Sequence, residues 1–404
     1  MVGTMAKIDD SIKKKVPELR FKGFTDDWEQ RKLTEIVNRV NKSSNSDVLP
    51  KVEFEDIVSG EGRLNKDISS KFDSRKGTLF EPENILYGKL RPYLKNWLFS
   101  DFEGVALGDF WVFEATDVSV PSFDYYLIQS DNYQKVANDT SGTKMPRSDW
   151  KNVSSTDFAI PSKDEQKQIG AFFKQLDNTI VLHQRRLDLL KEQKKGYLQK
   201  MFPKNGAKVP ELRFAGFADD WEERKLKELG EIQTGNTPPT SDSDNYSLDG
   251  VLWVTPTDIK SLVISNTAKK LSQVGVTKAR IAKAGSILVT SIASIGKNTL
   301  LRMDAGFNQQ INSLTPTSEN DSYFLLTQSE KWSEKMKQTA ASATMQIVNK
   351  TDFSNISTYV PVHKEEQEKI GAFFKQLDDT IDLHQRKLDL LKEQKKGFLQ
   401  KMFI

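Results

Sequence analysis

The chain has 404 residues, which at about 100–200 residues per domain indicates two to four domains. It contains no cysteine, so disulfides, thiolate zinc sites and cysteine nucleophiles are excluded. The net charge of +3 is a weaker basic excess than an obvious nucleic-acid-binding chain shows. No apolar run approaches the roughly 18–20 residues that span a bilayer, and residues 1–15 form a polar tail without a signal-peptide stretch. We therefore expect a cytoplasmic protein.

Two segments of the chain occur twice, nearly unchanged. Val16–Ile36 returns as Val209–Leu229 with 16 of 21 positions identical, and Asp164–Pro203 returns as Glu365–Ile404 with 32 of 40 identical. The segments between them, 37–163 and 230–364, share little. Random drift after a tandem duplication would change all segments alike. Some requirement must therefore preserve the constant segments while it leaves the variable segments free to differ.

The first variable segment, 37–163, is predicted to be a mixed α/β domain. Its β-branched and aromatic runs predict strands over Asn84–Lys95 and Val105–Ala115, followed by a helix over Phe123–Ala137. It holds 16 basic against 19 acidic residues, so a site for a polyanion must be a local face rather than the domain average. The basic candidates lie near a strand end and in a later Gly/Pro loop: Lys89, Arg91, Lys95, Lys144 and Arg147.

The constant segment 164–203 is predicted to be one long helix with a coiled-coil seam. Apolar residues recur every four and three positions, which is the heptad period of such a seam. The seam residues of this copy are Ile169, Phe173, Leu176, Ile180, His183, Leu187 and Leu190, with Lys194 following in the same register.

The second variable segment, 230–364, is also predicted to be mixed α/β. Strands are expected over Val251–Thr255, Ser286–Ile292 and Ile311–Leu314, and a helix over Ser322–Lys337. With 13 basic and 11 acidic residues it is again nearly neutral. Arg and Lys suit guanine edges and phosphates, whereas Asn and Gln suit adenine edges. The polar candidates are Ser294, Lys297, Asn308, Gln309, Gln310, Thr344 and Gln346; for each, a solvated surface role is the alternative.

The second constant helix, 365–404, repeats the seam with Ile370, Phe374, Leu377, Ile381, His384, Leu388 and Leu391, and with Lys395. One amphipathic helix cannot bury its own stripe, so we predict that the two copies pack antiparallel within one chain about a pseudo-two-fold axis. Pairing between two chains is the alternative. We expect His183 and His384 to fix the register as polar seam residues, although a metal or pH-switch role is the functional alternative. No metal site is predicted, because His363 is the only other histidine and lies outside the helices.

Signatures of catalysis are missing from the sequence. There is no GxGxxG, HExxH or GxSxG motif, and Gly296-Lys297 lacks the earlier glycine and the following Ser or Thr of a phosphate loop. We therefore predict no catalytic residues. An enzyme with an unrecognised site and a coiled-coil scaffold with tandem ligand-binding domains remain the competing classes.

The constant–variable–constant–variable plan resembles the specificity subunit of type I restriction–modification systems over essentially the whole chain. The resemblance is carried by the ELRFxGF…DDWE openings at Glu18–Glu29 and Glu211–Glu222 and by the two helices. Leu90–Tyr93, Gly142–Arg147 and Asn308–Gln310 also look like parts of that family's target-recognition domains.

The resemblance implies an α+β fold with two target-recognition domains separated by antiparallel helices. The domains would span 16–163 and 204–364, and the helices 164–203 and 365–404. Each domain would read one half of a bipartite, asymmetric site in double-stranded DNA. The helices would set the spacing and dock two methyltransferase subunits, which restriction and motor subunits join. S-adenosylmethionine, ATP and Mg would then belong to those partners, and this chain would direct adenine methylation and restriction without catalysing either.

Overall fold

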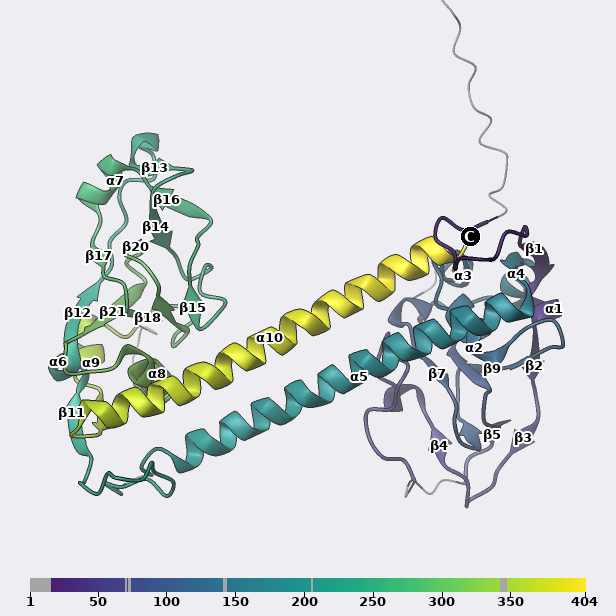
Figure 1. Cartoon of the computed structure of the whole chain (residues 1–404), viewed down its shortest axis with the longest axis horizontal. Coiled ribbons are helices and arrows are strands. Elements are labelled where there is room, and N and C mark those ends of the chain that lie inside the picture. Colours follow the sequence, from purple (N-terminus) through teal and green to yellow (C-terminus); the bar gives the residue numbers. More distant parts are fainter. Residues whose placement is uncertain (1–15, 70, 72–73, 141–143, 205, 342–346) are drawn as a thin grey trace, which may run out of the picture. The chain divides into compact units, whose positions relative to one another are not determined.

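The computed structural model describes residues 16–69, 71, 74–140, 144–204, 206–341 and 347–404. The chain divides into two compact units (Figure 1). Unit 1 combines Met1–Arg185 with Arg386–Ile404, and unit 2 is Arg186–Gln385. The end of the chain therefore belongs to the same unit as its beginning, as the predicted in-chain pairing of the two helices requires.

The sheets of unit 1 form its mixed α/β core. A four-stranded sheet has the order β2-β9-β6-β7, a second has the order β3-β5-β8-β4, and β1 pairs with β10. The strands are β1 (Glu29–Lys32), β2 (Val37–Val40), β3 (Ser43–Ser44), β4 (Lys51–Val52), β5 (Gly77–Phe80), β6 (Ile85–Gly88), β7 (Trp97–Phe99), β8 (Gly104–Ala106), β9 (Phe110–Ala115) and β10 (Asp157–Ile160).

Short helices cover these sheets and fill the rest of unit 1. They are α1 (Leu33–Ile36), η1 (Phe54–Asp56), η2 (Pro92–Leu94), α2 (Pro121–Leu127), α3 (Asp131–Ala137) and α4 (Trp150–Ser155). The predicted helix over 123–137 is thus two helices, because Ser130 caps the second one by accepting a hydrogen bond from the Tyr133 backbone. The predicted strand over 84–95 ends at Gly88 and gives way to η2.

Unit 2 repeats this plan with longer sheets. Their orders are β12-β21-β18-β19-β15 and β13-β16-β14-β20-β17, and β11 pairs with β22. The strands are β11 (Glu222–Lys225), β12 (Gly230–Thr234), β13 (Tyr246–Ser247), β14 (Val251–Val254), β15 (Val263–Ile264), β16 (Lys269–Leu271), β17 (Ile281–Ala282), β18 (Ile287–Thr290), β19 (Asn298–Leu301), β20 (Ala305–Phe307), β21 (Ile311–Pro316) and β22 (Ser357–Val360). Its helices are α6 (Leu226–Leu229), η3 (Ser243–Asn245), α7 (Gln273–Lys278), α8 (Ser322–Ala341) and α9 (Lys350–Ser354).

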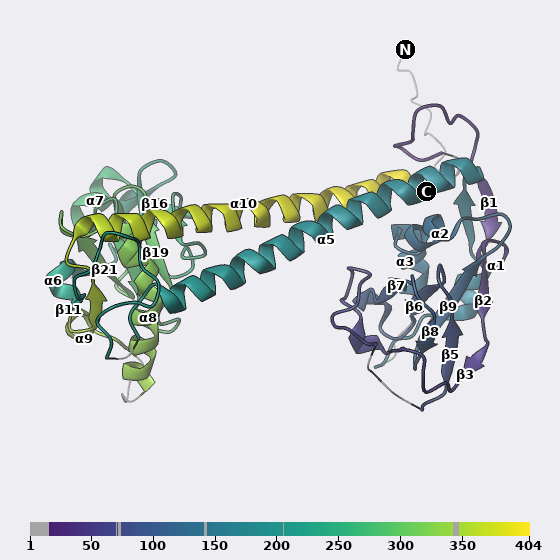
Figure 2. The ribbon, with the colours of Figure 1, turned by 60° about the horizontal axis from the view of Figure 1, so that its bottom comes forward.

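The two constant helices are α5 (Lys163–Lys200) and α10 (Lys364–Met402). In unit 1 the C-terminal end of α10 lies beside the first part of α5 (Figures 1 and 2). Phe172 of α5 meets Phe398 of α10 edge-to-face at 5.1 Å between ring centroids. In unit 2 Tyr197 and Phe373, at the equivalent positions, meet in the same way at 5.0 Å. Within each unit the helices therefore run antiparallel, as predicted, and equivalent pairs of residues meet in the two units.

All fourteen predicted seam residues are buried or half-buried, including both histidines. A half-buried ion pair crosses the seam in each unit. In unit 1 Lys395 Nζ lies 2.8 Å from Asp177 Oδ1, and Tyr126 donates its hydroxyl to the same carboxylate at 2.9 Å. In unit 2 Lys194 lies 2.6 Å from Asp378, which Tyr323 also contacts at 3.0 Å. Polar seam contacts of this kind fix register, because any slip would leave a half-buried charge unpaired.

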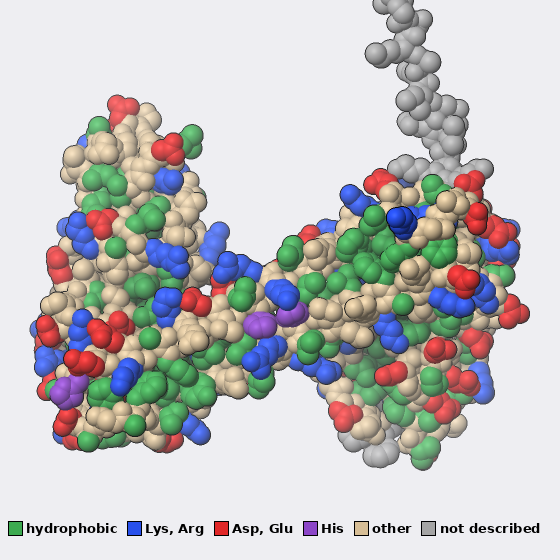
Figure 3. Space-filling model, in the orientation of Figure 1, with side chains coloured by type: hydrophobic (Ala, Val, Ile, Leu, Met, Phe, Trp, Pro, Cys, Tyr) green, Lys and Arg blue, Asp and Glu red, His purple; other side chains and the backbone are tan. Residues whose placement is uncertain are grey.

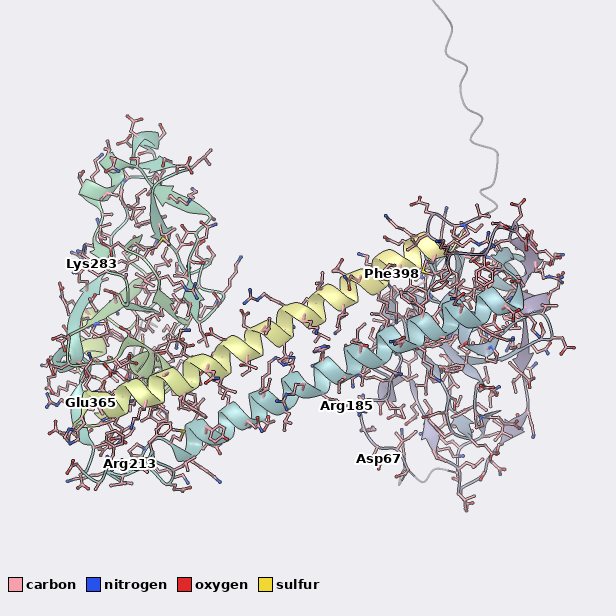
Figure 4. The ribbon with its side chains drawn as sticks, in the orientation of Figure 1. Asp67, Arg185, Arg213, Lys283, Glu365 and Phe398 are labelled. Carbon is pink, nitrogen blue, oxygen red and sulfur yellow. The ribbon has the colours of Figure 1, made fainter. Side chains whose placement is uncertain are left out.

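The constant opening segments are held by the constant helices. Arg20 donates through Nε and Nη2 to both carboxylate oxygens of Glu165, each at 2.7 Å. Arg213 binds Glu366 through the same atoms at 2.7 and 2.8 Å; Figure 4 labels Arg213 beside the start of α10. Both carboxylates are fully buried, so these charges depend on their partners. The repeated segments are therefore each other's packing partners, which accounts for part of their constancy.

Candidate nucleic-acid interface

The predicted basic residues of unit 1 come together at one end of strand β6. Beyond Gly88 the chain turns through Lys89–Lys95 and meets the segment around Arg147, which is far away in sequence. The Arg91 backbone N–H donates to Pro146 O at 2.7 Å, and Ser148 N–H donates to Lys89 O at 2.9 Å. We call residues 88–96, 107–109 and 146–148 the first cradle.

The charged side chains of the first cradle face solvent and surround one acidic residue, Asp109. Arg147 donates to Asp109 through Nη2 at 3.0 Å and Nε at 3.3 Å, and Lys89 Nζ lies 3.7 Å from the same carboxylate. The hydrogen bond to Asp109 raises the pKa of Arg147. Arg91, Lys95 and Lys144 are exposed. Four of the five predicted basic residues of this unit thus lie in the first cradle, where backbone hydrogen bonds or ion pairs hold them; Lys144 lies outside it.

Tyr93 and Asp109 belong to this cradle and were missed as candidate residues. Tyr93 is 57% exposed on η2, between Arg91 and Lys95, which both adopt left-handed backbone conformations with φ of 48° and 55°. An exposed aromatic flanked by cations suits base stacking or backbone contact in nucleic acid. Asp109 lies in a turn whose Gly108 has φ of 81°, which interrupts the strand predicted over 105–115. A Gly-Asp pair is a turn signal that could have revealed this break.

Unit 2 contains a second cradle at the equivalent end of β18: residues 290–297, 308–310 and 347–348. Three backbone hydrogen bonds of the first cradle have a counterpart in the second. Lys89 N–H donates to Asp109 O at 2.9 Å, as Ser291 N–H donates to Gln310 O at 2.8 Å. The Ser148 N–H donates to Lys89 O, and the Val348 N–H donates to Ser291 O in the same way. The Leu107 N–H donates to Val52 O, and its counterpart is the Asn308 N–H, which donates to Val254 O.

A bridge between distant segments also matches, since Leu90 pairs with Arg147 and Ile292 pairs with Ile347. The residues that follow Leu90 and Ile292 both have left-handed backbones, with φ of 48° at Arg91 and 63° at Ala293. The second cradle is therefore the first one built with other side chains: Ser291 stands for Lys89, Ala293 for Arg91, Gln310 for Asp109 and Ile347 for Arg147.

The polar candidates of unit 2 largely hold this cradle together. Asn308 Nδ2 donates to Thr237 Oγ1 at 3.4 Å, and its Oδ1 accepts from Gln310 N–H at 2.7 Å. Gln309 is exposed and accepts a hydrogen bond from Thr237. Lys297 is exposed, whereas Ser294 is half-buried and its carbonyl accepts from Thr290. Thr344 and Gln346 lie outside the described residues.

On the face that Figure 3 shows, the described residues form no single continuous basic patch on either unit. Acidic and basic side chains alternate over the visible surface of both (Figure 3). Among the described residues no group of three or more His, Asp or Glu could hold a metal ion. No helix in the described ranges is long and apolar enough to cross a membrane. The two units thus share a pair of loop cradles, each at the end of a sheet strand.

Comparison with known proteins identifies this arrangement. The sequence model of the family described as Type I restriction modification DNA specificity domain matches twice, over residues 25–192 and 218–393. The chain belongs to this family. Each match includes one complete cradle and part of a constant helix, so the duplicated unit of the sequence is the family's domain.

Two curated relatives are named as specificity subunits of type I restriction enzymes. The Type I restriction enzyme HindI specificity subunit of Haemophilus influenzae is 23% identical, over 88% of this chain and 95% of its own length. The MjaVIII specificity subunit of Methanocaldococcus jannaschii is 22% identical over 68% of each chain. The crystal structure of a type I restriction–modification S subunit from M. genitalium shares the fold with a TM-score of 0.69, at 13% identity over 96% of this chain and 99% of that one.

A chain solved in a study of complex assembly and conformational transition of the type I R-M system also shares the fold, with a TM-score of 0.52 at 19% identity over 92% of this chain. These likenesses confirm the predicted fold class of two α+β domains with long antiparallel helices in an internal repeat. They also confirm the resemblance drawn from the repeated motifs.

Proposed function

We propose that this chain reads a bipartite DNA site, one half with each cradle, for a type I restriction–modification complex. The observation that carries the proposal is the matched pair of cradles. Three backbone hydrogen bonds and one bridge recur in both units, but the side chains at the compared positions differ. A fixed frame with exchanged side chains is what reading two different half-sites requires, because base edges are distinguished by side-chain donors and acceptors.

The constant helices support docking of two methyltransferase subunits. Leu182 and Leu189 on α5 are 66% and 49% exposed, and Leu383 and Leu390 on α10 are 62% and 58% exposed. Each pair is seven residues apart, off the buried seam, and the residues are identical in the two copies. We propose these repeated, exposed leucines as the docking stripe of each helix. Two equal stripes fit two equal partners, and catalysis, S-adenosylmethionine, ATP and Mg would then belong to the partner subunits.

The direct test is to express the chain together with methyltransferase subunits of its system and to map methylated adenines in cellular DNA. One asymmetric motif with two specified halves and an unread gap is the expected result. The isolated chain, incubated with DNA, S-adenosylmethionine, ATP and Mg, should neither methylate nor cleave. Turnover by the pure chain, or a motif that does not depend on the chain, would refute the proposal.

The helices α5 and α10 are proposed to set the gap between the half-sites, because each begins in one unit and ends in the other. Inserting seven residues after Leu190 and after Leu391 keeps the heptad phase. It lengthens each helix by about 10 Å at 1.5 Å per residue, or roughly three base pairs. We expect the methylated motif to keep both halves and to widen its gap. Activity should fall, because one half-site also rotates about the DNA axis. An active variant with an unchanged gap would contradict this role.

A further inference from the structure

Because the two cradles share a backbone frame, their side chains can be compared position by position. At one position a charged side chain is replaced by an apolar one. Arg147 in the first cradle corresponds to Ile347 in the second, since each forms the bridge to the loop after the central strand. Its neighbour Asp109 corresponds to Gln310, because the carbonyls of both accept the matching backbone hydrogen bond. A charged, oriented pair in unit 1 is therefore replaced by a neutral, partly apolar one in unit 2.

The Arg147–Asp109 pair is built for direction rather than for charge. Asp109 fixes the guanidinium through Nε and Nη2, while Nη1 has no hydrogen-bond partner among the described residues. The Arg147 side chain is still 52% exposed, so its end can reach a ligand. An exposed pair of this kind contributes little to folding. Its value is that the planar donor fork is held in one orientation.

The adjacent carboxylate argues against a phosphate as the ligand. Asp109 lies near both Arg147 and Lys89, so it offsets only one of these two charges, but its carboxylate sits beside the guanidinium and would repel a phosphate brought close to it. The O6 and N7 atoms of guanine are uncharged acceptors in the major groove, and a guanidinium binds both at once. An arginine oriented by a carboxylate is thus better matched to a guanine edge than to the DNA backbone.

We propose that Arg147, oriented by Asp109, reads a guanine in the half-site of the first domain, and that Asp109 is the positioning residue for this contact. The second cradle carries isoleucine at the corresponding position and has no such requirement there. This inference rests on the proposed function, because it names the base class that one of the two reading sites selects.

The test uses the full chain assembled with its methyltransferase subunits and a set of duplexes in which each specified position of the motif is changed in turn. Arg147→Ala should erase the preference for a G·C pair at one position of one half-site. The loss expected there is roughly 5- to 150-fold in relative methylation rate, the worth of one bidentate base contact. Arg147→Lys keeps the charge but not the fork; because lysine can also bind a guanine edge, it should weaken the preference less than alanine does. Asp109→Asn should lose part of it.

Arg31→Ala is the matched control. Arg31 also pairs with a carboxylate, that of Glu29 at 2.9 Å, but lies on β1 rather than in the cradle. It should leave every position of the motif unchanged. Melting curves of each variant check that the fold is intact, and rates at two salt concentrations separate base from phosphate contacts.

Three outcomes overturn the inference. Uniform weakening on all duplexes with a shallower salt dependence would make Arg147 a phosphate contact. An unchanged motif would mean that it touches no base, and relaxation at an A·T pair would assign a different base. These results differ from failure of the proposed function, in which the wild-type complex itself would show no bipartite motif.

Discussion

The two units teach most where they agree and where they do not. Both hold the opening segment by a buried Arg–Glu pair and both lock the helices with a Lys–Asp–Tyr cluster. Both also build a cradle on the same backbone hydrogen bonds, yet fill it with different side chains. The repeated segments that contact each other have nearly the same sequence in both units, whereas the exposed loops of the cradles differ. A molecule of this kind can change what it reads without changing how it folds.

The largest expected effect comes from the helix seam. Leu187 is 1% exposed, so Leu187→Asp places an unpaired charge in the core and should cost more than about 4 kcal/mol of unfolding free energy. Leu189 lies two residues further on the same helix and is 49% exposed, so Leu189→Asp should change stability by less than about 0.5 kcal/mol.

Far-UV circular dichroism during thermal unfolding measures both variants. Leu189→Asp should nevertheless weaken co-purification with methyltransferase subunits, because it alters the exposed stripe. Equal stability of the two variants would show that the seam is not packed as described. Normal assembly of Leu189→Asp would remove that leucine from the docking surface.

The next largest effect tests whether the two units fold alike. Arg20→Ala leaves the fully buried Glu165 carboxylate without its partner, which typically costs about 3–5 kcal/mol. Arg213→Ala should cost a similar amount in unit 2, because Glu366 is equally buried. Urea unfolding monitored by proteolysis at sites in each unit reports the two separately. Arg224→Ala, whose partner Glu222 is exposed, should cost about 0–1 kcal/mol. Unequal effects of the two buried pairs would break the symmetry argued here.

Sequence patterns predicted the shared frame better than the cradles. The heptads located α5 and α10 to within a few residues, because a seam repeated over many turns is a strong signal. Lys89, Arg91 and Arg147 were selected from one loop and one distant segment, and the fold brings them together. The turn at Gly108-Asp109 was missed because apolar residues on both sides of it suggested one unbroken strand. Arg147 and Ile347 correspond because their backbones occupy the same place in the fold. Their side chains are too different for the sequence to show this correspondence.

The cradles themselves allow a smaller, local test of independence. Arg91→Ala removes an exposed cation of the first cradle, and Gln309→Ala removes an exposed amide of the second. A base-edge contact is worth about 1–3 kcal/mol, so each change should relax one half of the methylated motif and leave the other half intact. Adenine-methylation mapping in cells that carry each variant gives the result. Relaxation of both halves by either substitution would mean that the domains do not read independently.

The last expected effect is a pH dependence from Asp124, a buried acid of unit 1, compared with Asp321, a half-buried acid of unit 2. Asp124 in α2 is fully buried, and burial raises its pKa well above the usual value. Ser119 Oγ lies 2.7 Å from both Asp124 Oδ2 and Ile36 O; its single hydrogen can serve only one of them, so a protonated carboxyl satisfies both contacts. In unit 2, Asp321 also has a raised pKa from burial, but its carboxylate accepts the Phe324 backbone N–H at 2.7 Å, which opposes the rise.

These environments fix the sign of a pH dependence. Because the folded pKa is raised, the folded state binds the proton more tightly than the unfolded chain. The resulting stability is complete below the unfolded carboxyl pKa of about 3.9 and is lost as pH rises toward the folded pKa. Relative to Asp124→Asn, which cannot ionise, the wild type should therefore lose stability with rising pH, by at most about 1.4 kcal/mol per pH unit for this one group. Asp321→Asn should show the same sign over a narrower range. Denaturation midpoints of the three proteins across a pH series measure the difference. A gap between the wild type and Asp124→Asn that stays constant with pH would show that Asp124 titrates as it does in the unfolded chain, and that its burial carries no charge penalty.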